Sequence, residues 1–106
     1  MTDADMIALI LAQPEAEASS HFDTPDFRVR KKIFATHRGP GLFVLKLTRE
    51  QQEMLVDAEP ATFRPLANKW GQQGWTEAHV ATLDAAGARS ALKMAWSNVA
   101  PKSLQG

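Results

Sequence analysis

The residues of this chain that could do chemistry are three histidines and several carboxylates, and their spacing favours no catalytic centre. None of His21, His37 and His79 stands at helical metal-ligand spacing from a carboxylate or from another histidine. The sequence contains no G-x-S-x-G nucleophile motif, phosphate-binding loop or dinucleotide fingerprint. Glu77 and Asp84 lie near His79 in sequence, but we interpret these residues as solvated surface groups. We therefore predict that the protein is not an enzyme.

Metal binding is the second chemistry that the sequence can be tested for. The chain has no cysteine, which excludes thiolate ligands, thiolate nucleophiles and disulfides. Glu50, Glu53 and Asp57 stand at i, i+3 and i+7 of an expected helix and could form a carboxylate ridge. We interpret them instead as the exposed face of that helix. We predict neither a metal nor a cofactor.

Positive charge is concentrated in one block of the chain. The net charge is zero, yet the 22 residues from Arg28 to Arg49 hold seven bases and no carboxylate. A hairpin with a basic turn could act as a wing that contacts DNA phosphates in a groove. The alternative is that these bases form ordinary solvated strand edges, where lysine also prevents edge-to-edge aggregation. The candidate nucleic-acid-binding residues are Arg28, Arg30, Lys31, Lys32, Arg38 and Lys69.

Two tryptophans and one lysine are further candidates for binding. Trp70 and Trp75, with Lys69 nearby, could offer a stacking surface for bases. We favour the interpretation that both tryptophans pack in the core against the last helix. Lys46 interrupts an apolar run, so it either extends past the end of the sheet, pairs with a carboxylate or binds a small ligand.

The strands that position these residues follow from hydrophobic periodicity. Phe27 to Leu47 contains three consecutive strands separated by reversals at Arg30–Lys32 and Gly39–Gly41. Leu42 to Leu47 is apolar at nearly every position, which predicts a central strand covered on both faces. The further expectations are a short edge strand within residues 15–22, a turn over residues 23–26, an irregular segment around Pro65 and residues 71–74, and a strand over residues 75–83.

Three helices are indicated by capping residues and by prolines. The N-terminal caps are Thr2, Thr48 and Asp84, and the helices end at Pro14, Pro60 and Pro101. These elements predict an α+β fold, one domain over residues 1–106, with an antiparallel sheet and helices on one face. The residues that we expect to share one core are Phe34, Leu45, Leu47, Leu55, Leu92, Trp96 and Val99.

The order and spacing of several short motifs resemble a known family. They are Lys32-Ile33-Phe34-Ala35, Gly41-Leu42, Val44-Leu45-Lys46-Leu47, the Pro65 segment, Gly74-Trp75, and Trp96 with Val99. From about residue 20 onward the chain resembles the MmcQ/YjbR family of small bacterial proteins with a frataxin-like α+β fold. The family usually joins its first helix to the sheet by a link that contains glycine, whereas this chain has Pro14 and no glycine there.

The resemblance implies an antiparallel sheet flanked by helices and DNA binding through a double-wing arrangement. The frataxin-like fold also suggests iron delivery, but this chain lacks the dense acidic first helix that such a role uses. We therefore expect weak and largely sequence-nonspecific contact with double-stranded DNA. The alternatives are an adaptor for a protein partner, using the sheet face or the Trp70–Trp75 arm, and a small-ligand pocket near Lys46.

The location that we expect is the cytoplasm, without a membrane. The first residues include Asp3 and Asp5 where a signal peptide would carry basic residues. No apolar run approaches the roughly 18 residues that a membrane helix needs.

Overall fold

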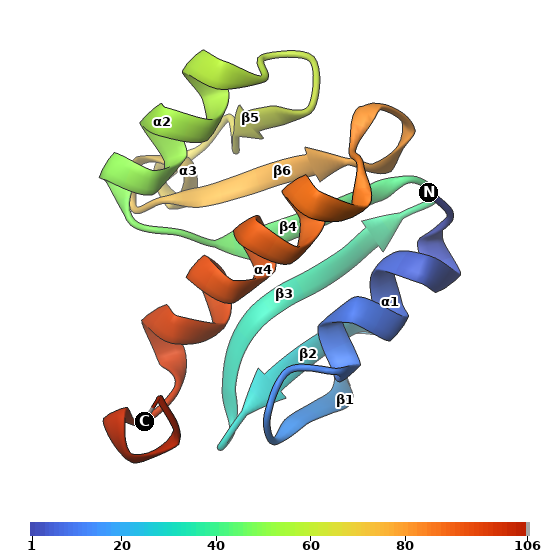
Figure 1. Cartoon of the computed structure of the whole chain (residues 1–106), viewed down its shortest axis with the longest axis vertical. Coiled ribbons are helices and arrows are strands. Elements are labelled where there is room, and N and C mark those ends of the chain that lie inside the picture. The colour runs from blue at the N-terminus through green and yellow to red at the C-terminus, as the bar shows by residue number, and fades with distance from the viewer. Residues whose placement is uncertain (106) are drawn as a thin grey trace.

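The computed structural model describes residues 1–105, and its strands form one antiparallel sheet in the order β1-β2-β3-β4-β6-β5 (Figure 1). The strands are β1 (Ala16–His21), β2 (Thr24–Val29), β3 (Lys32–Gly39), β4 (Leu42–Lys46), β5 (Phe63–Pro65) and β6 (Trp75–His79). The helices are α1 (Asp3–Leu11), α2 (Arg49–Ala58), α3 (Lys69–Gln72) and α4 (Ala85–Val99), with short 3-10 turns at Val80–Thr82 and Lys102–Leu104. The predicted α+β class is confirmed.

Strands β1 to β4 form a meander because each pair is joined by a tight turn. Phe22 and Asp23 join β1 to β2 with φ angles of 48° and 63°, and Arg30 and Lys31 join β2 to β3 with 50° and 72°. Two successive positive φ angles give the mirror-image turn whose twist matches that of the flanking strands. The turn expected over residues 23–26 is therefore wrong, because Thr24 already pairs with β1. The reversal expected at residues 30–32 is shorter than predicted, since β3 begins at Lys32.

The second half of the sheet contains elements that the sequence did not indicate. Segment 61–74 holds β5 and α3, which span only three and four residues and are too short to show a period. Strand β6 ends at His79 and not at Leu83, because the chain turns there and the Val80 N–H donates to the carbonyl of Gly41. Strand β4 lies in the middle of the sheet, as predicted, between β3 and β6.

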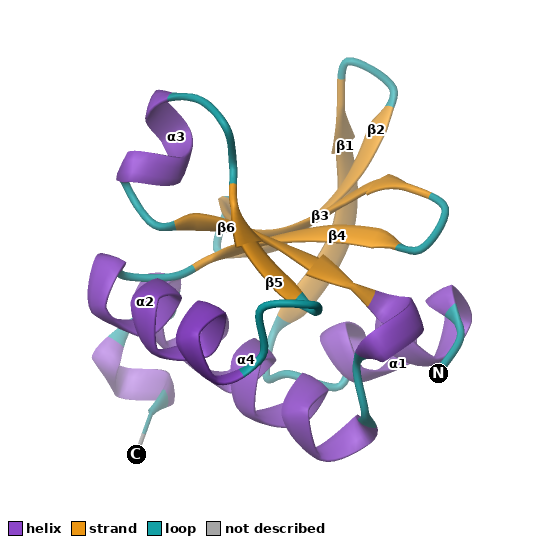
Figure 2. Ribbon diagram, turned by 90° about the horizontal axis from the view of Figure 1, so that it is seen from above, coloured by secondary structure: helices purple, strands orange, loops and turns teal. Residues whose placement is uncertain are grey.

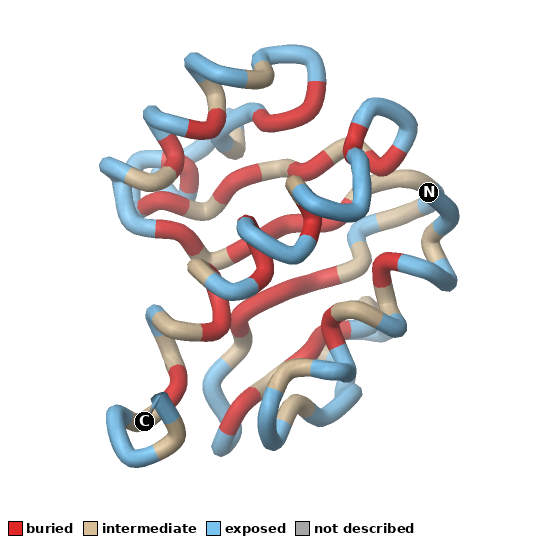
Figure 3. Tube along the Cα trace, viewed as in Figure 1, coloured by how far each residue is buried: buried red, intermediate tan, exposed pale blue. Residues whose placement is uncertain are grey.

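Helices α1, α2 and α4 cover one face of the sheet, and α3 lies on the opposite side (Figure 2). The buried positions follow the central strands and the inner sides of these three helices (Figure 3). Six of the seven predicted core residues are buried in one cluster, and Val99 packs against that cluster while partly exposed. The prediction of a common core is therefore confirmed.

The predicted helix caps are present. Thr2 and Thr48 each form a capping box, with Asp5 and Gln51 respectively as the reciprocal partner. Asp84 begins α4 by accepting a hydrogen bond from the backbone of Gly87 at 2.6 Å.

Within residues 1–105, no helix combines the length and the apolar character needed to cross a membrane.

Candidate nucleic-acid interface and the uncovered sheet face

The six candidate bases do not form one continuous patch. Lys31 and Lys32 lie at the turn between β2 and β3, whereas Arg38 lies near the other end of β3. At about 3.3 Å per residue, the six steps along the strand from Lys32 to Arg38 span roughly 20 Å. The two ends of β3 therefore belong to different surfaces.

Arg28 is held by a buried carboxylate. Its Nε donates to Oδ1 of Asp26 at 2.8 Å and its Nη2 donates to Oδ2 at 3.0 Å. Asp26 has no exposed side-chain surface, and the hydrogen bonds from Arg28, followed by one from His21, lower the pKa of its carboxyl group. The charge of Arg28 is therefore largely neutralised within the protein.

Arg30 is also paired with a carboxylate, but at the surface. It lies in the turn after β2 and not in the strand that carries Arg28. Its Nε and Nη2 each donate to one oxygen of Glu15 at 3.1 Å, and these bonds lower the pKa of Glu15. Glu15 adopts φ 56° in the link between α1 and β1, the left-handed conformation for which glycine is usual. The first strand accordingly starts at Ala16 without a glycine in the link.

Lys31 and Lys32, which we call the basic turn, are the candidate bases most available to a ligand. Both are exposed, and neither forms an ion pair with a carboxylate of residues 1–105. Other bases lie at the same end of the sheet, because in an antiparallel pair the start of β3 is adjacent to the end of β4. They are Lys46 at the end of β4, Arg49 at the start of α2 and Lys69 on α3.

Lys46 lies over an aromatic ring. Its Nζ is 5.1 Å from the centroid of the Trp75 ring, which is within the range of a cation–π interaction. The register pairs the two residues directly across β4 and β6. Of the interpretations that the sequence left open, pairing with a carboxylate is not observed within the described part of the chain.

The sheet face opposite α4, which we call the open face, is covered only in part. The β1–β2 hairpin and α3 both extend on this side of the sheet (Figure 2). Residues of β1, of β3 and of the α3 arm line a groove of about 210 Å³. The groove is lined by His21, Ile33, Thr36, Arg38, Val44, Leu66, Asn68, Trp70 and Trp75. The interpretation that both tryptophans pack in the core against α4 is therefore wrong, because they line this groove on the opposite face. Strand β4 is covered on both faces as predicted, since Phe43, Val44 and Leu45 are all buried. Trp75 leaves β6 on the side opposite to the buried Thr76, so alternation along the strand turns it away from the core.

The segment over residues 66–74, which we call the α3 arm, is held by a buried glutamine. Gln52 reaches from α2, and its Nε2 lies 3.0 Å from the carbonyl of Gly71, 3.2 Å from that of Trp75 and 3.0 Å from Oγ1 of Thr76. A Cβ at Gly71 would lie 1.9 Å from the carbonyl oxygen of Leu66, so only glycine permits this approach. The role of Gln52 could not be predicted from the sequence, because a glutamine in a polar helix is ordinarily solvated.

His21 is oriented by the same carboxylate that binds Arg28. Its Nδ1 lies 2.7 Å from Oδ2 of Asp26, which leaves Nε2 as the nitrogen free to meet a ligand in the groove. A turn over residues 23–26, as expected from the sequence, does not predict the contact between His21 and Asp26. With the turn at Phe22 and Asp23, His21 and Asp26 lie on adjacent strands near the hairpin tip.

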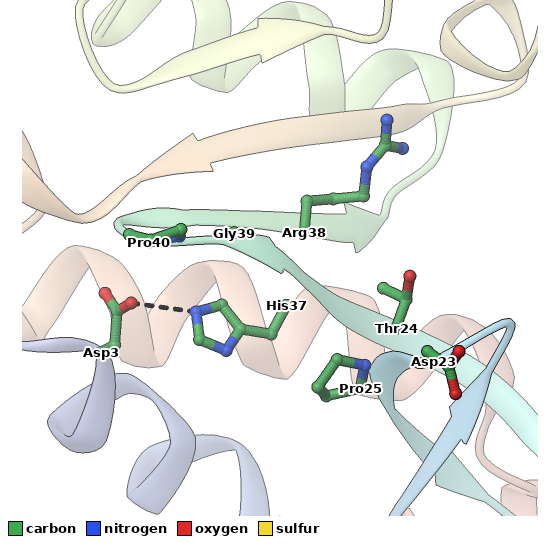
Figure 4. A pocket seen from close by; sticks show the side chains of 8 residues that line it. All are labelled: Asp3, Asp23, Thr24, Pro25, His37, Arg38, Gly39 and Pro40. Carbon is green, nitrogen blue, oxygen red and sulfur yellow. Dashed lines mark hydrogen bonds and ion pairs between the residues drawn. The ribbon is translucent and has the colours of Figure 1, made fainter.

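The remaining two histidines also have one carboxylate partner each. His37 Nε2 lies 2.9 Å from Oδ2 of Asp3 beside a surface hollow of about 330 Å³, from which Arg38 points away (Figure 4). Asp3 also accepts a hydrogen bond from the backbone of Gly41 at 2.9 Å, and this bond is the main reason that the pKa of Asp3 is lowered. These contacts fasten the start of α1 to the β3–β4 hairpin.

His79 Nε2 lies 3.2 Å from Oε1 of Glu77 on the open face. Asp84 serves as the cap of α4, so these three residues do not act as one site. Across residues 1–105, no group of three or more histidine, aspartate or glutamate side chains is placed to hold a metal ion.

Comparison with known proteins places the chain in a family. No curated protein matches it. The YjbR family model matches residues 11–98, which run from the end of α1 through every strand of the sheet and most of α4. The match covers well over half of the 106 residues, so the chain belongs to the YjbR family.

Proposed function

We propose that this protein is a non-enzymatic DNA-binding protein that holds double-stranded DNA weakly and without base preference. The observation that carries the proposal is the basic turn, where Lys31 and Lys32 are exposed and have no carboxylate partner within residues 1–105. Unpaired cations at the tip of a hairpin are suited to phosphate contact, because they can release counterions from the DNA. The YjbR family is not a known enzyme family, which agrees with a binding role.

The backbone of the turn supports a role beyond folding. Asn-Gly is the preferred sequence for a turn with two positive φ angles, yet this turn is formed by Arg30 and Lys31. A residue with a Cβ in this conformation costs about 1 kcal/mol relative to glycine. Long basic side chains at such positions favour a functional reason for their presence.

The surroundings of the basic turn limit the expected affinity. Lys46, Arg49 and Lys69 extend the positive charge along the same end of the sheet. Glu50 and Glu53 are exposed on the first turns of α2, and Glu53 lies 3.6 Å from Arg49. Since these acids repel phosphate, we expect two to three effective phosphate contacts and weak binding.

A salt titration tests the proposal. Fluorescence anisotropy of labelled duplex DNA should give a plot of log K against log salt with a slope of about −2 to −3. Between 50 and 200 mM salt, binding should weaken by roughly 16- to 64-fold. Replacing Lys31→Ala together with Lys32→Ala should reduce the slope by about two, equally for duplexes of unrelated sequence.

The control removes two bases from α4, outside the basic turn. Arg89→Ala with Lys93→Ala changes the net charge by the same amount at exposed positions of α4. This variant should keep the slope of the unmodified protein. No binding at 50 mM salt, or an equal effect of the two double substitutions, would contradict the proposal.

A second candidate function is favoured by one residue. Phe22 has 99% of its side chain exposed at the tip of the β1–β2 hairpin, which is unusual for a large apolar residue. A protein partner that covers the hairpin tip would remove this surface from water. If the DNA titration fails, an adaptor role through Phe22 becomes the better explanation.

A further inference from the structure

The groove on the open face combines aromatic surface with the positive charge of an exposed arginine. Trp70 and Trp75 contribute indole rings, and Ile33 and Val44 contribute an apolar floor. Arg38 is exposed on the same lining and forms no ion pair with a carboxylate of residues 1–105. The lining contains no aspartate or glutamate, so it favours a ligand with a flat ring and a negative group.

The backbone that carries Trp70 is held in place before any ligand arrives. Trp70 is 48% exposed, its backbone N–H donates to Oδ1 of Asn68, and the carbonyl of Gly71 in the α3 arm accepts from Gln52. A tryptophan has only two side-chain torsions, so stacking on one whose backbone is already ordered costs little conformational entropy.

Polar groups in the groove can bind the edge of a ring. His21 is held through Nδ1 by Asp26, so its Nε2 has a fixed direction. Thr36 contributes a hydroxyl group, and Asn68 contributes the amide protons that its contact with Trp70 leaves free. Nucleobases carry donors and acceptors on their edges, whereas a simple aromatic acid does not, so these groups favour a base.

The size of the groove sets a limit on what it can enclose. Sites that enclose a drug-sized ligand usually measure about 300–1,000 Å³. At about 210 Å³, this groove has room for one ring system while the rest of the ligand remains outside. A phosphate at the mouth of the groove would be accessible to the exposed guanidinium of Arg38.

We infer that the groove binds one nucleotide whose base is unpaired, with the base stacked on Trp70 and Trp75 and the phosphate at Arg38. The nucleotide is either a free mononucleotide or one residue of a single strand. This site is distinct from the proposed duplex contact, because it lies on the open face. It binds a base that would be inaccessible in a base-paired duplex. Stacking on aromatic side chains tolerates every base, so little sequence preference is expected.

The three tryptophans of the chain provide the test by NMR. Each indole N–H gives one signal in a ¹H–¹⁵N spectrum, and the signal of Trp96 serves as an internal control because its Nε1–H donates to the carbonyl of Pro14. Thymidine monophosphate, thymidine and a single strand of ten deoxythymidines are titrated separately. We expect the Trp70 and Trp75 signals to shift while the Trp96 signal stays in place.

Two substitutions define the roles within the site. Trp70→Ala should weaken binding about 5- to 150-fold, followed on the Trp75 signal, because base stacking on one aromatic side chain has this strength. Arg38→Ala should weaken the binding of thymidine monophosphate about 5-fold and leave the binding of thymidine unchanged, because only the phosphate contacts Arg38. The matched controls, Met54→Ala and Arg89→Ala, lie at exposed positions outside the groove and should change neither affinity.

Each outcome decides the proposal. Shifts with the mononucleotide support a site for free nucleotides, and shifts with the ten-residue strand alone support a site for single strands. The inference is overturned if neither thymidine monophosphate nor the ten-residue strand shifts the Trp70 and Trp75 signals. It is also overturned if Trp70→Ala leaves binding unchanged. Duplex binding that depends on Lys31 and Lys32 but shifts no tryptophan signal would preserve the proposed function while the groove site fails.

Discussion

Asp26 is a carboxylate without solvent contact, and three hydrogen bonds keep it ionised. Arg28 supplies two of them and His21 supplies the third. An unpaired carboxylate in this position would lose several kcal/mol of hydration. The arrangement therefore stabilises the β1–β2 hairpin and at the same time orients the histidine that faces the groove.

The first residue-scale prediction is that Asp26→Asn destabilises the protein at neutral pH. Loss of hydrogen bonds to a charged group should cost about 2–3 kcal/mol. The pKa of Asp26 is lowered from its usual value of 3.8, so its contribution is fully present above about pH 4 and is lost as the pH falls through the lowered pKa. Urea unfolding of the parent protein and the variant between pH 7 and pH 2 measures both effects.

The difference in unfolding free energy between the two proteins should be largest at pH 7 and should shrink below pH 4. Asp57→Asn, at an exposed position of α2, is the control and should show no such pH-dependent difference. A difference that stays constant down to pH 2 would mean that Asp26 is not ionised in the folded protein.

At this scale the sequence identified the bases but not their partners. Arg28 and Arg30 stand in a block without acids, which predicted free cations. Their partners, Asp26 and Glu15, belong to the preceding acidic block. Asp26 lies two residues before Arg28 in β2, whereas Glu15 meets Arg30 through the α1–β1 link. Lys31 and Lys32 are exposed and form no ion pair with a carboxylate of residues 1–105.

At the scale of elements, the sequence was most informative where a local rule decides the structure. The caps at Thr2, Thr48 and Asp84 depend on hydrogen bonds within three residues, and all three were predicted. The α3 arm depends on Gln52 and on close backbone approaches at Gly71 and Gly74, which are tertiary contacts. Because no local pattern encodes such contacts, the sequence indicates Trp70 and Trp75 as a possible stacking surface but not the groove that they line.

The element-scale prediction concerns the β1–β2 turn. Phe22 and Asp23 have φ angles of 48° and 63°, where Asn-Gly is preferred. Replacing Phe22→Asn with Asp23→Gly should raise the unfolding free energy by about 1 kcal/mol, because strain in the left-handed conformation is relieved. Thermal unfolding should show the variant melting at a higher temperature.

The outcome also bears on why Phe22 is present. The Phe22 ring meets the edge of the His21 ring at a centroid distance of 6.3 Å, and this is the contact that the substitution removes. A variant that melts at a lower temperature would mean that this contact outweighs the backbone strain. A more stable variant would instead indicate that Phe22 is kept for a purpose other than stability.

On the scale of the whole molecule, the charge blocks of the sequence become interleaved in the fold. Two acidic residues that precede Arg28 neutralise part of the basic block, because Asp26 in β2 pairs with Arg28 and Glu15 in the α1–β1 link pairs with Arg30. The surface that results has a basic turn at one end and an open groove on one face, without a continuous positive stripe. The predicted core and the predicted strand order of the meander are nevertheless confirmed, because both predictions depend on apolar periodicity and not on charge.

The last prediction concerns Trp96, which joins the two ends of the chain. Trp96 is 5% exposed in the core, and its Nε1–H donates to the carbonyl of Pro14 at 2.9 Å across 82 residues of sequence. Trp96→Ala should lower the unfolding free energy by about 3–5 kcal/mol, a large part of the 5–15 kcal/mol typical of a folded protein. Urea unfolding followed by circular dichroism measures the loss.

Two further variants separate the causes of that loss. Trp96→Phe keeps an aromatic ring in the core but leaves the carbonyl of Pro14 without its donor, so it should cost only about 1–2 kcal/mol. Trp70→Ala removes a tryptophan that is half exposed and should change stability by less than about 0.5 kcal/mol. If Trp96→Ala were as stable as Trp70→Ala, α4 would not be docked through this ring. We expect Trp96→Ala to be the most destabilised variant, followed by Trp96→Phe and then Trp70→Ala. This order would mean that the Trp96 indole anchors the helical layer while the Trp70 indole is available to the groove.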